Sequence, residues 1–315
     1  MQGGAVHCNN TCGATFSYRR NNDIRIFITG ATGFIGSAIV QEFITDGHQV
    51  FGLARSDDAA RALAAAGAEV HRGDVEDIES LRTGAEASDG VIHTGFIHDF
   101  SRFVEVCEID RRAIEALGLA LVGSSRPLVV TSGTAVSIIP GRPATEDDAP
   151  NSPMPRVQSE LATDSLVDKG VNATVVRLPQ VHDPYKQGLI TYLIAAAREK
   201  GVSAYVGDGL NRWPAVHRLD AAHLYKLTFE KGTAGLRYNA VAEEGVPLRQ
   251  IADVIGKVLK IPVVSQTPEE AAEHFGWLAA FVSHDLPASS KLTRDRLDWH
   301  PTNVGLIADL EEGKF

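Results

Sequence analysis

Short apolar runs alternate with helical patterns along the first half of the chain. Largely continuous apolar runs predict strands at 24–29, 49–54, 69–71, 90–93, 128–132 and 173–177. Helical periodicity predicts helices at 34–46, from the mid-fifties to 66, and at 77–87, 100–122 and 156–169. Strands without polar alternation are typical of a parallel sheet that is covered on both faces. The strict alternation of strand and helix therefore predicts an α/β, Rossmann-like, doubly wound sheet.

The alternation of strand and helix ends near residue 177. After this point, loops rich in Gly, Pro and Asp join helical patterns at 188–200, 220–230, 248–259 and 268–280. The pattern predicts three parts: a disordered leader at 1–22, a dinucleotide-binding domain at 23–181, and a smaller lobe over 182–315. We expect that lobe to be mostly helical, to return one or two strands to the sheet, and to bind the substrate. The active cleft is expected between the lobe and the carboxyl ends of the strands.

Composition narrows the class of protein. The 315 residues have ordinary apolar content (44%) and a net charge of −10, which argues against binding to nucleic acid or acidic membranes. No apolar run approaches the roughly 20 residues that span a bilayer. Three cysteines fit a reducing compartment, so we expect a cytoplasmic protein. His7, Cys8 and Cys12 lie close together, but without a second ligand cluster they do not predict a metal site.

The first strand runs into a glycine-rich turn that opens a helical pattern. The turn reads Thr29-Gly30-Ala31-Thr32-Gly33-Phe34-Ile35-Gly36. In such a turn the first glycine permits the tight bend, the second lets backbone approach a pyrophosphate, and the third lets the helix pack on its strand. The amide groups of the new helix then face the phosphates. This context predicts a dinucleotide site.

The end of the second strand bears on which dinucleotide is bound. An acid at this point holds the ribose 2′-hydroxyl of NAD(H), whereas here the strand ends in Ala54-Arg55-Ser56. A guanidinium suits a 2′-phosphate, so NADP(H) is favoured over NAD(H). Alternatively, Arg55 pairs with Asp57 or Asp58 at the surface. Asp74, after the third strand, suits either the adenine edge or the cap of the next helix.

With these motifs in order, the chain from residue 23 onward resembles the extended short-chain dehydrogenase/reductases, the NAD(P)-dependent epimerase/dehydratase group. The resemblance covers the glycine turn and the segments at 73–75, 93–96, 129–134, 176–181 and 214–222. It implies a cofactor site formed by Gly30, Thr32, Gly33, Phe34, Ile35, Gly36, Arg55, Ser56, Asp74, Val75, Thr94, Gly95, Phe96, Pro179 and Val181. It also implies that Ser132 or Thr134 polarises a substrate carbonyl, and that a homodimer forms through the two helices at 100–122 and 156–169.

The chain departs from this family at the catalytic pair. The family uses Tyr-x-x-x-Lys, in which the lysine lowers the tyrosine pKa for proton exchange with the substrate. Here Arg156 and Glu160 stand at those positions, and no tyrosine lies between Tyr18 and Tyr185. The two residues share a helix face, so they form either a surface salt bridge or part of the cleft. An arginine stays protonated, and it could stabilise an oxyanion or hold a substrate carboxylate.

Proton transfer then needs another group, and histidine is the natural candidate near neutral pH. His98 follows the fourth strand, close to the expected nicotinamide, and Asp99 either orients it or caps the next helix. Further candidates for the substrate pocket, which could equally serve to pack the lobe, are His182, Trp213, His217 and Arg218.

The sequence thus predicts an NADP(H)-dependent oxidoreductase that acts on a small carbonyl substrate, with Ser132, Thr134, Arg156, Glu160 and His98 as the catalytic candidates. Two alternatives stay open, because one scaffold hosts many chemistries. The first is an isomerase, dehydratase or lyase that uses its cofactor transiently or only as structure. The second is a non-catalytic dinucleotide-binding regulator.

Overall fold

The computed structural model describes residues 24–315, and the predictions for the leader and for His7, Cys8 and Cys12 lie outside this range. A seven-stranded parallel sheet forms the centre of the molecule, in the order β11-β6-β5-β4-β1-β2-β3. Its strands are β1 (Arg25–Thr29), β2 (Gln49–Ala54), β3 (Glu69–Arg72), β4 (Gly90–His93), β5 (Leu128–Gly133), β6 (Ala173–Leu178) and β11 (Arg237–Asn239). This order reverses direction at β1, as in a doubly wound fold.

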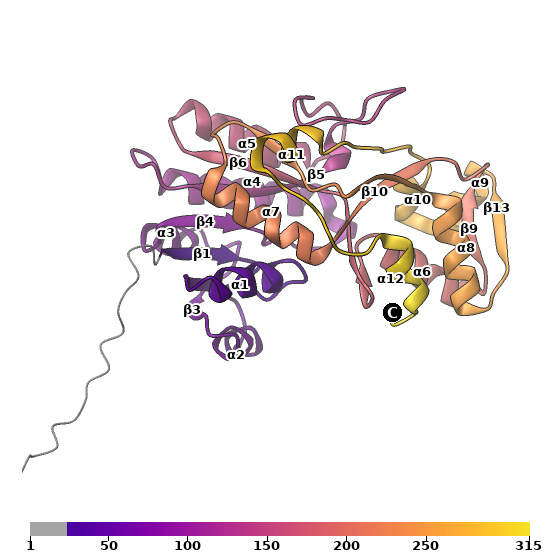
Figure 1. The fold of residues 1–315 in the computed structure, drawn as a ribbon, viewed down its shortest axis with the longest axis horizontal. Coiled ribbons are helices and arrows are strands. Elements are labelled where there is room, and N and C mark those ends of the chain that lie inside the picture. The colour runs from indigo at the N-terminus through magenta and orange to yellow at the C-terminus, as the bar shows by residue number, and fades with distance from the viewer. Residues whose placement is uncertain (1–23) are drawn as a thin grey trace, which may run out of the picture.

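Helices cover both faces of the sheet (Figure 1). One face carries α1 (Gly36–Thr45), α2 (Asp57–Ala65) and α7 (Arg218–Lys231), which share one apolar core with the strands. The other face carries α3 (Ile78–Glu86), α4 (Phe103–Leu119) and α5 (Val157–Asp168), which share a second core. Strands that bury side chains on both faces explain the continuous apolar runs, and the predicted Rossmann-like sheet is confirmed.

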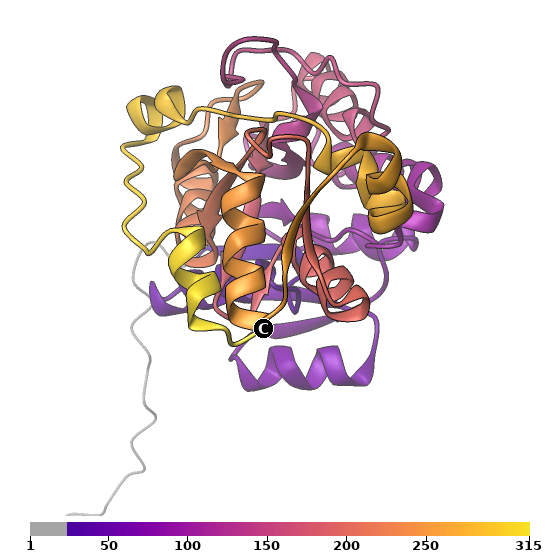
Figure 2. The same ribbon diagram turned by 90° about the vertical axis from the view of Figure 1, so that its right-hand side faces the viewer.

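A smaller lobe lies beyond the carboxyl ends of the strands (Figures 1 and 2). Its helices are α6 (Ile190–Lys200), α8 (Leu248–Leu259), α9 (Pro268–Phe275), α10 (Ala279–Val282) and α12 (Leu306–Glu312), with the short turn η3 (Gly276–Leu278). It also contains two small sheets, ordered β12-β10-β7-β8 and β13-β9. Their strands are β7 (Gln180–Asp183), β8 (Lys186–Gln187), β9 (Ser203–Val206), β10 (Arg212–His217), β12 (Glu243–Pro247) and β13 (Val263–Gln266).

Two segments of the second half return to the large sheet. Helix α7 packs its Ala221, Leu224 and Tyr225 into the core of the first face, and β11 pairs with β6 at the edge of the sheet. The chain after α10 also crosses back, since Ala288 bridges to Ala144 and α11 (Lys291–Leu297) lies near α7 and β11 (Figure 1). The sheet and the lobe are therefore tied together by several crossings.

Two negative findings concern the described residues 24–315 only. No helix there combines the length and apolarity needed to cross a membrane. No group of three or more His, Cys, Asp or Glu side chains in the same range could hold a metal ion.

Candidate active site

A cavity of about 1120 Å³ opens at the carboxyl ends of β1, β4 and β5, where the strand order reverses. This volume slightly exceeds the roughly 300–1,000 Å³ of ordinary small-molecule sites, which leaves room for a dinucleotide and a small substrate together. All fifteen residues expected at the cofactor line it, from the glycine turn to Pro179 and Val181. Ser132, Thr134, Arg156, His98, Asp99 and Trp213 line it as well.

The glycine turn has the geometry that its sequence demands. Gly30 adopts a φ of +66°, which favours glycine, and a Cβ there would lie 2.7 Å from the backbone of Thr94. The Gly33 amide donates a 2.8 Å hydrogen bond to the Gly30 carbonyl and closes the turn. A Cβ on Gly36 would lie 2.1 Å from the Gly30 carbonyl oxygen, so only glycine lets α1 begin here. Within the described residues the amides of Phe34, Ile35 and Gly36, at the start of α1, have no hydrogen-bond partner, which leaves them available to a phosphate.

Gly36→Ala tests this packing. Because the added methyl must displace the Gly30 carbonyl, we expect a loss of about 1–3 kcal/mol in the free energy of unfolding and weaker NADPH binding. Urea denaturation and calorimetric titration with NADPH measure the two effects. Gln41→Ala, an exposed change in the same helix, is the control and should alter neither. Wild-type affinity in Gly36→Ala would contradict the assignment of the turn to the phosphates.

Beside the end of β2, the cavity contains an arginine that has no acidic partner among residues 24–315. Asp57 pairs with Arg72 at 2.6 Å and Asp58 pairs with Arg61, so the expected surface pairing of Arg55 with either acid is wrong. Arg55 is exposed to the cavity and forms no ion pair with any residue of 24–315.

The structure also shows which residues cap the next two helices, α2 and α3. Ser56 caps α2 by accepting a 3.2 Å hydrogen bond from the Ala59 amide. Asp77, and not Asp74, caps α3, and the Asp74 carboxylate stays at the cavity wall. The capping interpretation of Asp74 is therefore wrong; its carboxylate accepts a 3.0 Å hydrogen bond from the Glu76 amide, and its role at the adenine edge stays a prediction.

At the opposite end of the cavity, Arg156 is held by three partners. Its Nη1 lies 2.6 Å from Asp110 Oδ2, and its Nη2 donates a 2.8 Å hydrogen bond to the Thr131 carbonyl. The guanidinium carbon lies 4.1 Å from the centre of the Phe96 ring, a cation–π contact. The side chain is 12% exposed, so the charge lies fixed at the cavity wall with little access to bulk water.

Asp110, on α4, is the centre of a buried network behind Arg156. It accepts a 2.6 Å hydrogen bond from Ser159 and lies 3.2 Å from His93 Nε2, whose Nδ1 lies 2.7 Å from Thr29 Oγ1. Burial opposes ionisation of Asp110, but the charge of Arg156 and the bond to His93 outweigh it and lower its pKa to about 2. Asp110 is therefore ionised at neutral pH and fixes the position of Arg156.

Hydroxyl groups and a histidine complete this end of the cavity. The Ser132 Oγ is buried and has no hydrogen-bond partner within the part of the chain that the structure describes, and the Thr134 side chain is also buried at the cavity wall. His98 is exposed to the cavity, and its partial desolvation there, followed by the charges of Lys186 and Arg156, lowers its pKa below the usual 6.5. Asp99 caps the turn η1 (Phe100–Arg102) and accepts hydrogen bonds from Ser101, so the structure favours its capping role.

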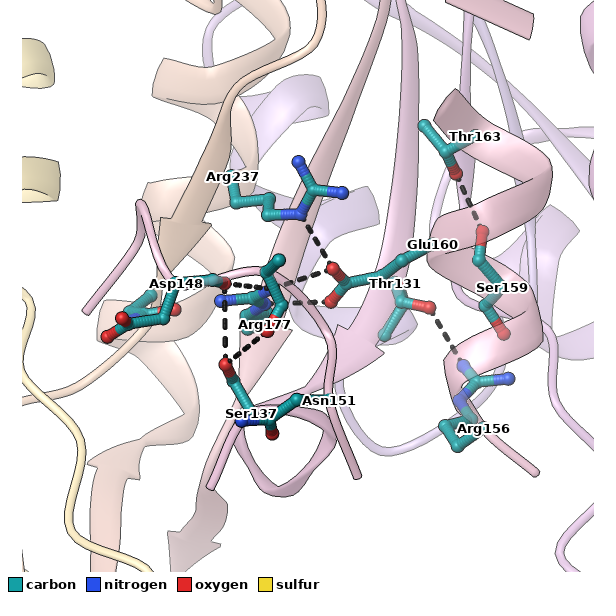
Figure 3. Close-up of polar contacts among 12 residues, drawn as sticks. Thr131, Ser137, Asp148, Asn151, Arg156, Ser159, Glu160, Thr163, Arg177 and Arg237 are labelled. Carbon is teal, nitrogen blue, oxygen red and sulfur yellow. Dashed lines mark hydrogen bonds and ion pairs between the residues drawn. The ribbon is translucent and has the colours of Figure 1, made fainter. Parts of the chain in front are cut away.

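The expectation that Glu160 faces the cleft beside Arg156 is wrong (Figure 3). Glu160 is completely buried and accepts hydrogen bonds of 2.7 Å from Arg177, through two nitrogens, and from Arg237. Arg156 is the N-cap residue of α5 and Glu160 lies in its first turn, but their partners lie on different elements, with Asp110 on α4 and Arg177 on β6. Glu160 thus ties α5 to the sheet.

Three substrate candidates lie outside the cavity, which corrects their expected role. His182 is completely buried and contacts Asp309 of α12 at 2.6 Å, and His217 lies 3.9 Å from the same carboxylate and caps α7. Arg218 donates to Ser37 Oγ at 2.8 Å. These side chains join the lobe and α7 to the sheet. Trp213 does reach the cavity wall, as a fully buried side chain of the lobe core.

The sequence analysis missed other cavity residues. Lys186, in the hairpin after β7, lies with its Nζ 5.6 Å from the centre of the Phe34 ring. Tyr192, on α6, is the one tyrosine of residues 24–315 that lines the cavity. Phe100 and Phe281 also line it. Lys186 begins β8 after the two-residue turn that follows β7, and Tyr192 and Phe281 lie on helices of the lobe, so no local motif marks any of the three.

Comparison with known proteins decides the family. A family model described as "NAD dependent epimerase/dehydratase family" matches residues 26–241, more than half of the chain. The chain belongs to this family. The match spans the glycine turn, the strands of the large sheet and Arg156. The placement of Arg156 at the tyrosine position of the epimerase/dehydratase family stays a prediction from the sequence motif.

Relatives extend over nearly the whole chain. An uncharacterized protein of Schizosaccharomyces pombe is 50% identical over 294 residues, which cover 93% of this chain and 100% of the relative. UDP-glucose 4-epimerase of Streptomyces lividans is 26% identical and covers 90% and 93% of the two chains. Among solved structures, the dTDP-glucose 4,6-dehydratase DesIV of Streptomyces venezuelae, solved with NAD, has a TM-score of 0.74 at 19% identity and covers 92% and 95%. It shows that the two proteins share a fold.

Proposed function

We propose that this member of the epimerase/dehydratase family is an NADP(H)-dependent oxidoreductase acting on a small carbonyl compound. The observation that supports this proposal most directly is that one cavity has a glycine turn at one end and a fixed guanidinium, that of Arg156, at the other. A positive charge held in place beside buried hydroxyls suits an oxygen that gains negative charge in a transition state. This arrangement supports carbonyl chemistry.

The residues fit the nicotinamide cofactor that the family uses. The glycines leave a cradle that any Cβ would fill, and the amides of Phe34, Ile35 and Gly36 beside it form no hydrogen bond within residues 24–315. Gly30, Gly33 and Gly36 would hold the pyrophosphate, Asp74 and Val75 the adenosine, and Pro179 and Val181 would border the nicotinamide. When bound, the cofactor supplies or accepts a hydride, and the protein orients the reaction.

Each residue at the reaction end has a distinct role in this proposal. Arg156 stabilises the negative charge on the substrate oxygen, because a guanidinium keeps its proton and cannot serve as an ordinary acid. Ser132, whose Oγ has no other partner, donates a hydrogen bond to the same oxygen, with Thr134 beside it. His98 exchanges the proton with that oxygen directly or through water.

Arg55 is proposed to select NADP(H). Arg55→Ala should weaken NADPH binding by about tenfold or more, since a charge-assisted hydrogen bond contributes about 1.5–3 kcal/mol, and should leave NADH binding nearly unchanged. Titration calorimetry with both cofactors measures this. Arg61→Ala is the matched control, because that arginine lies on the next helix and pairs with Asp58. Equal losses for NADPH and NADH would refute the assignment.

His98 gives the reaction a defined pH dependence. An acid must be protonated to donate, so the kcat/KM for carbonyl reduction should rise as the pH falls from neutral through the lowered His98 pKa. The reverse oxidation should rise with pH over the same range. His98→Gln should flatten both profiles, as measured by initial rates between pH 5 and pH 8, about the span in which histidine titrates. A wild-type profile in this variant would exclude His98 as the proton donor.

The experiment for the function itself is a substrate screen. Purified protein with NADPH is offered aldehydes, ketones, enones and imines, and NADPH consumption is followed by absorbance. We expect turnover in at least one carbonyl class. UDP-glucose and dTDP-glucose are offered separately with NAD⁺ or NADP⁺ as the oxidant, because proteins named above act on nucleotide sugars. NADPH binding without turnover of any carbonyl compound would overturn the oxidoreductase, and conversion of a sugar nucleotide without net reduction of NAD⁺ or NADP⁺ would support an isomerase or dehydratase instead.

A further inference from the structure

A row of rings runs from Arg156 toward the outer surface of the lobe. The Phe96 ring, under the guanidinium, lies 5.4 Å from the His98 ring, and His98 lies 6.4 Å from Phe100. Phe100 in turn stacks on Trp277, with ring centres 4.3 Å apart and planes 8° from parallel. We call these four side chains, Phe96, His98, Phe100 and Trp277, the aromatic row. Apart from Arg156 at its inner end, the row carries no permanent charge.

The row is assembled from both parts of the molecule. Phe100 belongs to η1, after β4 of the large sheet, whereas Trp277 belongs to η3 of the lobe. Two further rings of the lobe close around this contact. The Tyr192 ring lies 5.9 Å from Phe100 and 5.1 Å from Trp277, and Phe281 lies 6.1 Å from Trp277. The two parts of the chain thus meet through aromatic faces and edges at this end of the cavity.

These rings differ from those of the protein core. Phe96, Phe100, Tyr192 and Phe281 line the cavity, and Tyr192 remains 38% exposed. Trp277 does not line the cavity and is 42% exposed, so it supports Phe100 from the outside. Exposed aromatic side chains that line a cavity mark a surface for a ligand, because burial alone would have hidden them. The rest of this wall is mainly apolar, formed by Phe103, Met154, Leu189, Trp213 and Leu286.

We propose that the substrate end of the cavity binds a planar aromatic carbonyl compound, such as an aryl aldehyde or ketone. The substrate ring lies against Phe100 and Tyr192, with Trp277 holding Phe100 in place, and the carbonyl oxygen points to Arg156. A flat ring gains offset-stacked or edge-to-face contacts that a saturated ring cannot make. This inference rests on the proposed function for its turnover, and its binding is tested separately.

The first test compares two aldehydes of similar size and different shape. Benzaldehyde is planar, whereas cyclohexanecarboxaldehyde has a puckered, saturated ring. The two aldehydes differ in intrinsic reactivity, so the ratio of their kcat/KM values with NADPH is divided by the ratio of their rates of reduction by borohydride without enzyme. We expect the corrected ratio to favour benzaldehyde by about tenfold, since each aromatic contact is worth roughly a factor of 2 to 12. Equal corrected values, or a preference for the saturated ring, would overturn the proposal.

Single substitutions test whether the aromatic row causes the preference for benzaldehyde. Phe100→Leu keeps an apolar side chain and removes the ring, so the preference should fall to about twofold or less while turnover of cyclohexanecarboxaldehyde persists and shows a folded enzyme. Trp277→Leu should reduce the preference partly. Tyr185→Leu, at an exposed tyrosine outside the cavity, should leave it unchanged. If Phe100→Leu keeps the full preference for benzaldehyde, the aromatic row takes no part in substrate recognition.

A binding experiment separates this inference from the oxidoreductase assignment. Benzamide and cyclohexanecarboxamide, which are not reduced, are titrated into protein saturated with NADP⁺ and followed by calorimetry. Tighter binding of benzamide, lost in Phe100→Leu, would establish the aromatic subsite even if no carbonyl compound is turned over. Equal binding of the two amides would overturn the subsite whatever the outcome of the substrate screen.

Discussion

Replacing Arg156 with alanine is expected to lower the kcat/KM of NADPH-dependent carbonyl reduction by about 10²–10³-fold. That is the usual cost of removing one donor to a developing oxyanion. The effect should appear mainly in kcat, because the guanidinium is proposed to act on charge that develops during the reaction. NADPH affinity should change little, since the glycine turn and Arg55 lie at the other end of the cavity. Steady-state kinetics and NADPH titration measure the two quantities.

The controls address the buried partner that this substitution leaves behind. Arg156→Ala deprives Asp110 of its counter-charge, so the melting temperature is measured alongside activity. Arg156→Lys retains the charge but loses the planar group that contacts Phe96, and should recover only part of the rate. Arg142→Ala removes an exposed arginine paired with Asp148 and should retain wild-type kinetics. Unchanged turnover in a folded Arg156→Ala protein would limit Arg156 to a structural role.

Replacing Glu160 should produce the largest loss of stability. Glu160→Ala leaves Arg177, which is 1% exposed, without its carboxylate, and removing one partner of such a buried pair costs about 3–5 kcal/mol. Arg237 loses the same partner but keeps Asp164. We therefore expect a marked decrease in the free energy of unfolding, measured by urea denaturation, although Glu160 does not line the cavity.

The Glu160 carboxylate should also make the free energy of unfolding depend on pH in the acidic range. Burial opposes its ionisation, but the hydrogen bonds and charges of Arg177 and Arg237 lower its pKa below the usual 4.5. Because the folded-state pKa is the lower one, the stabilisation is present above about pH 4.5 and is lost as the pH falls through the folded-state value. Glu160→Gln should lack this part of the acid dependence. Glu105→Gln, at an exposed pair with Arg102, is the control. A near-wild-type unfolding free energy for Glu160→Ala would contradict the role assigned to this cluster.

The fold could be predicted because its signals are local. Continuous apolar strands, alternating helices and the glycines of the first turn each specify nearby backbone, and their order specifies the sheet. That the glycine turn, Arg55 and Asp74 line one cavity could be predicted for the same reason, since all three follow strand ends, whereas their contact with a cofactor stays a prediction. The separation of Arg156 from Glu160 could not be predicted. Four residues apart on a helix, they share a face, but their partners on α4, β6 and β11 are distant in sequence.

The other contacts that the sequence did not predict also depend on residues distant along the chain. His182 and His217 stand near strand ends, but the pairing of β7 with β10 and the docking of α12 bury them against Asp309. The aromatic row joins residues from η1 and η3 that only the tertiary fold brings together. The family resemblance could not supply these contacts, because the segments that carry it end at residue 222, before Trp277 and Asp309.

The most direct test of the oxidoreductase assignment follows the transferred atom. The protein is incubated with benzaldehyde and NADPH that carries deuterium at the transferring position of the nicotinamide, and the alcohol is analysed by mass spectrometry. We expect one deuterium on the former carbonyl carbon, at a rate that falls by about 10²–10³-fold in Arg156→Ala. Alcohol without deuterium, or labelled alcohol formed equally fast by wild type and a folded Arg156→Ala, would contradict hydride transfer at the Arg156 site.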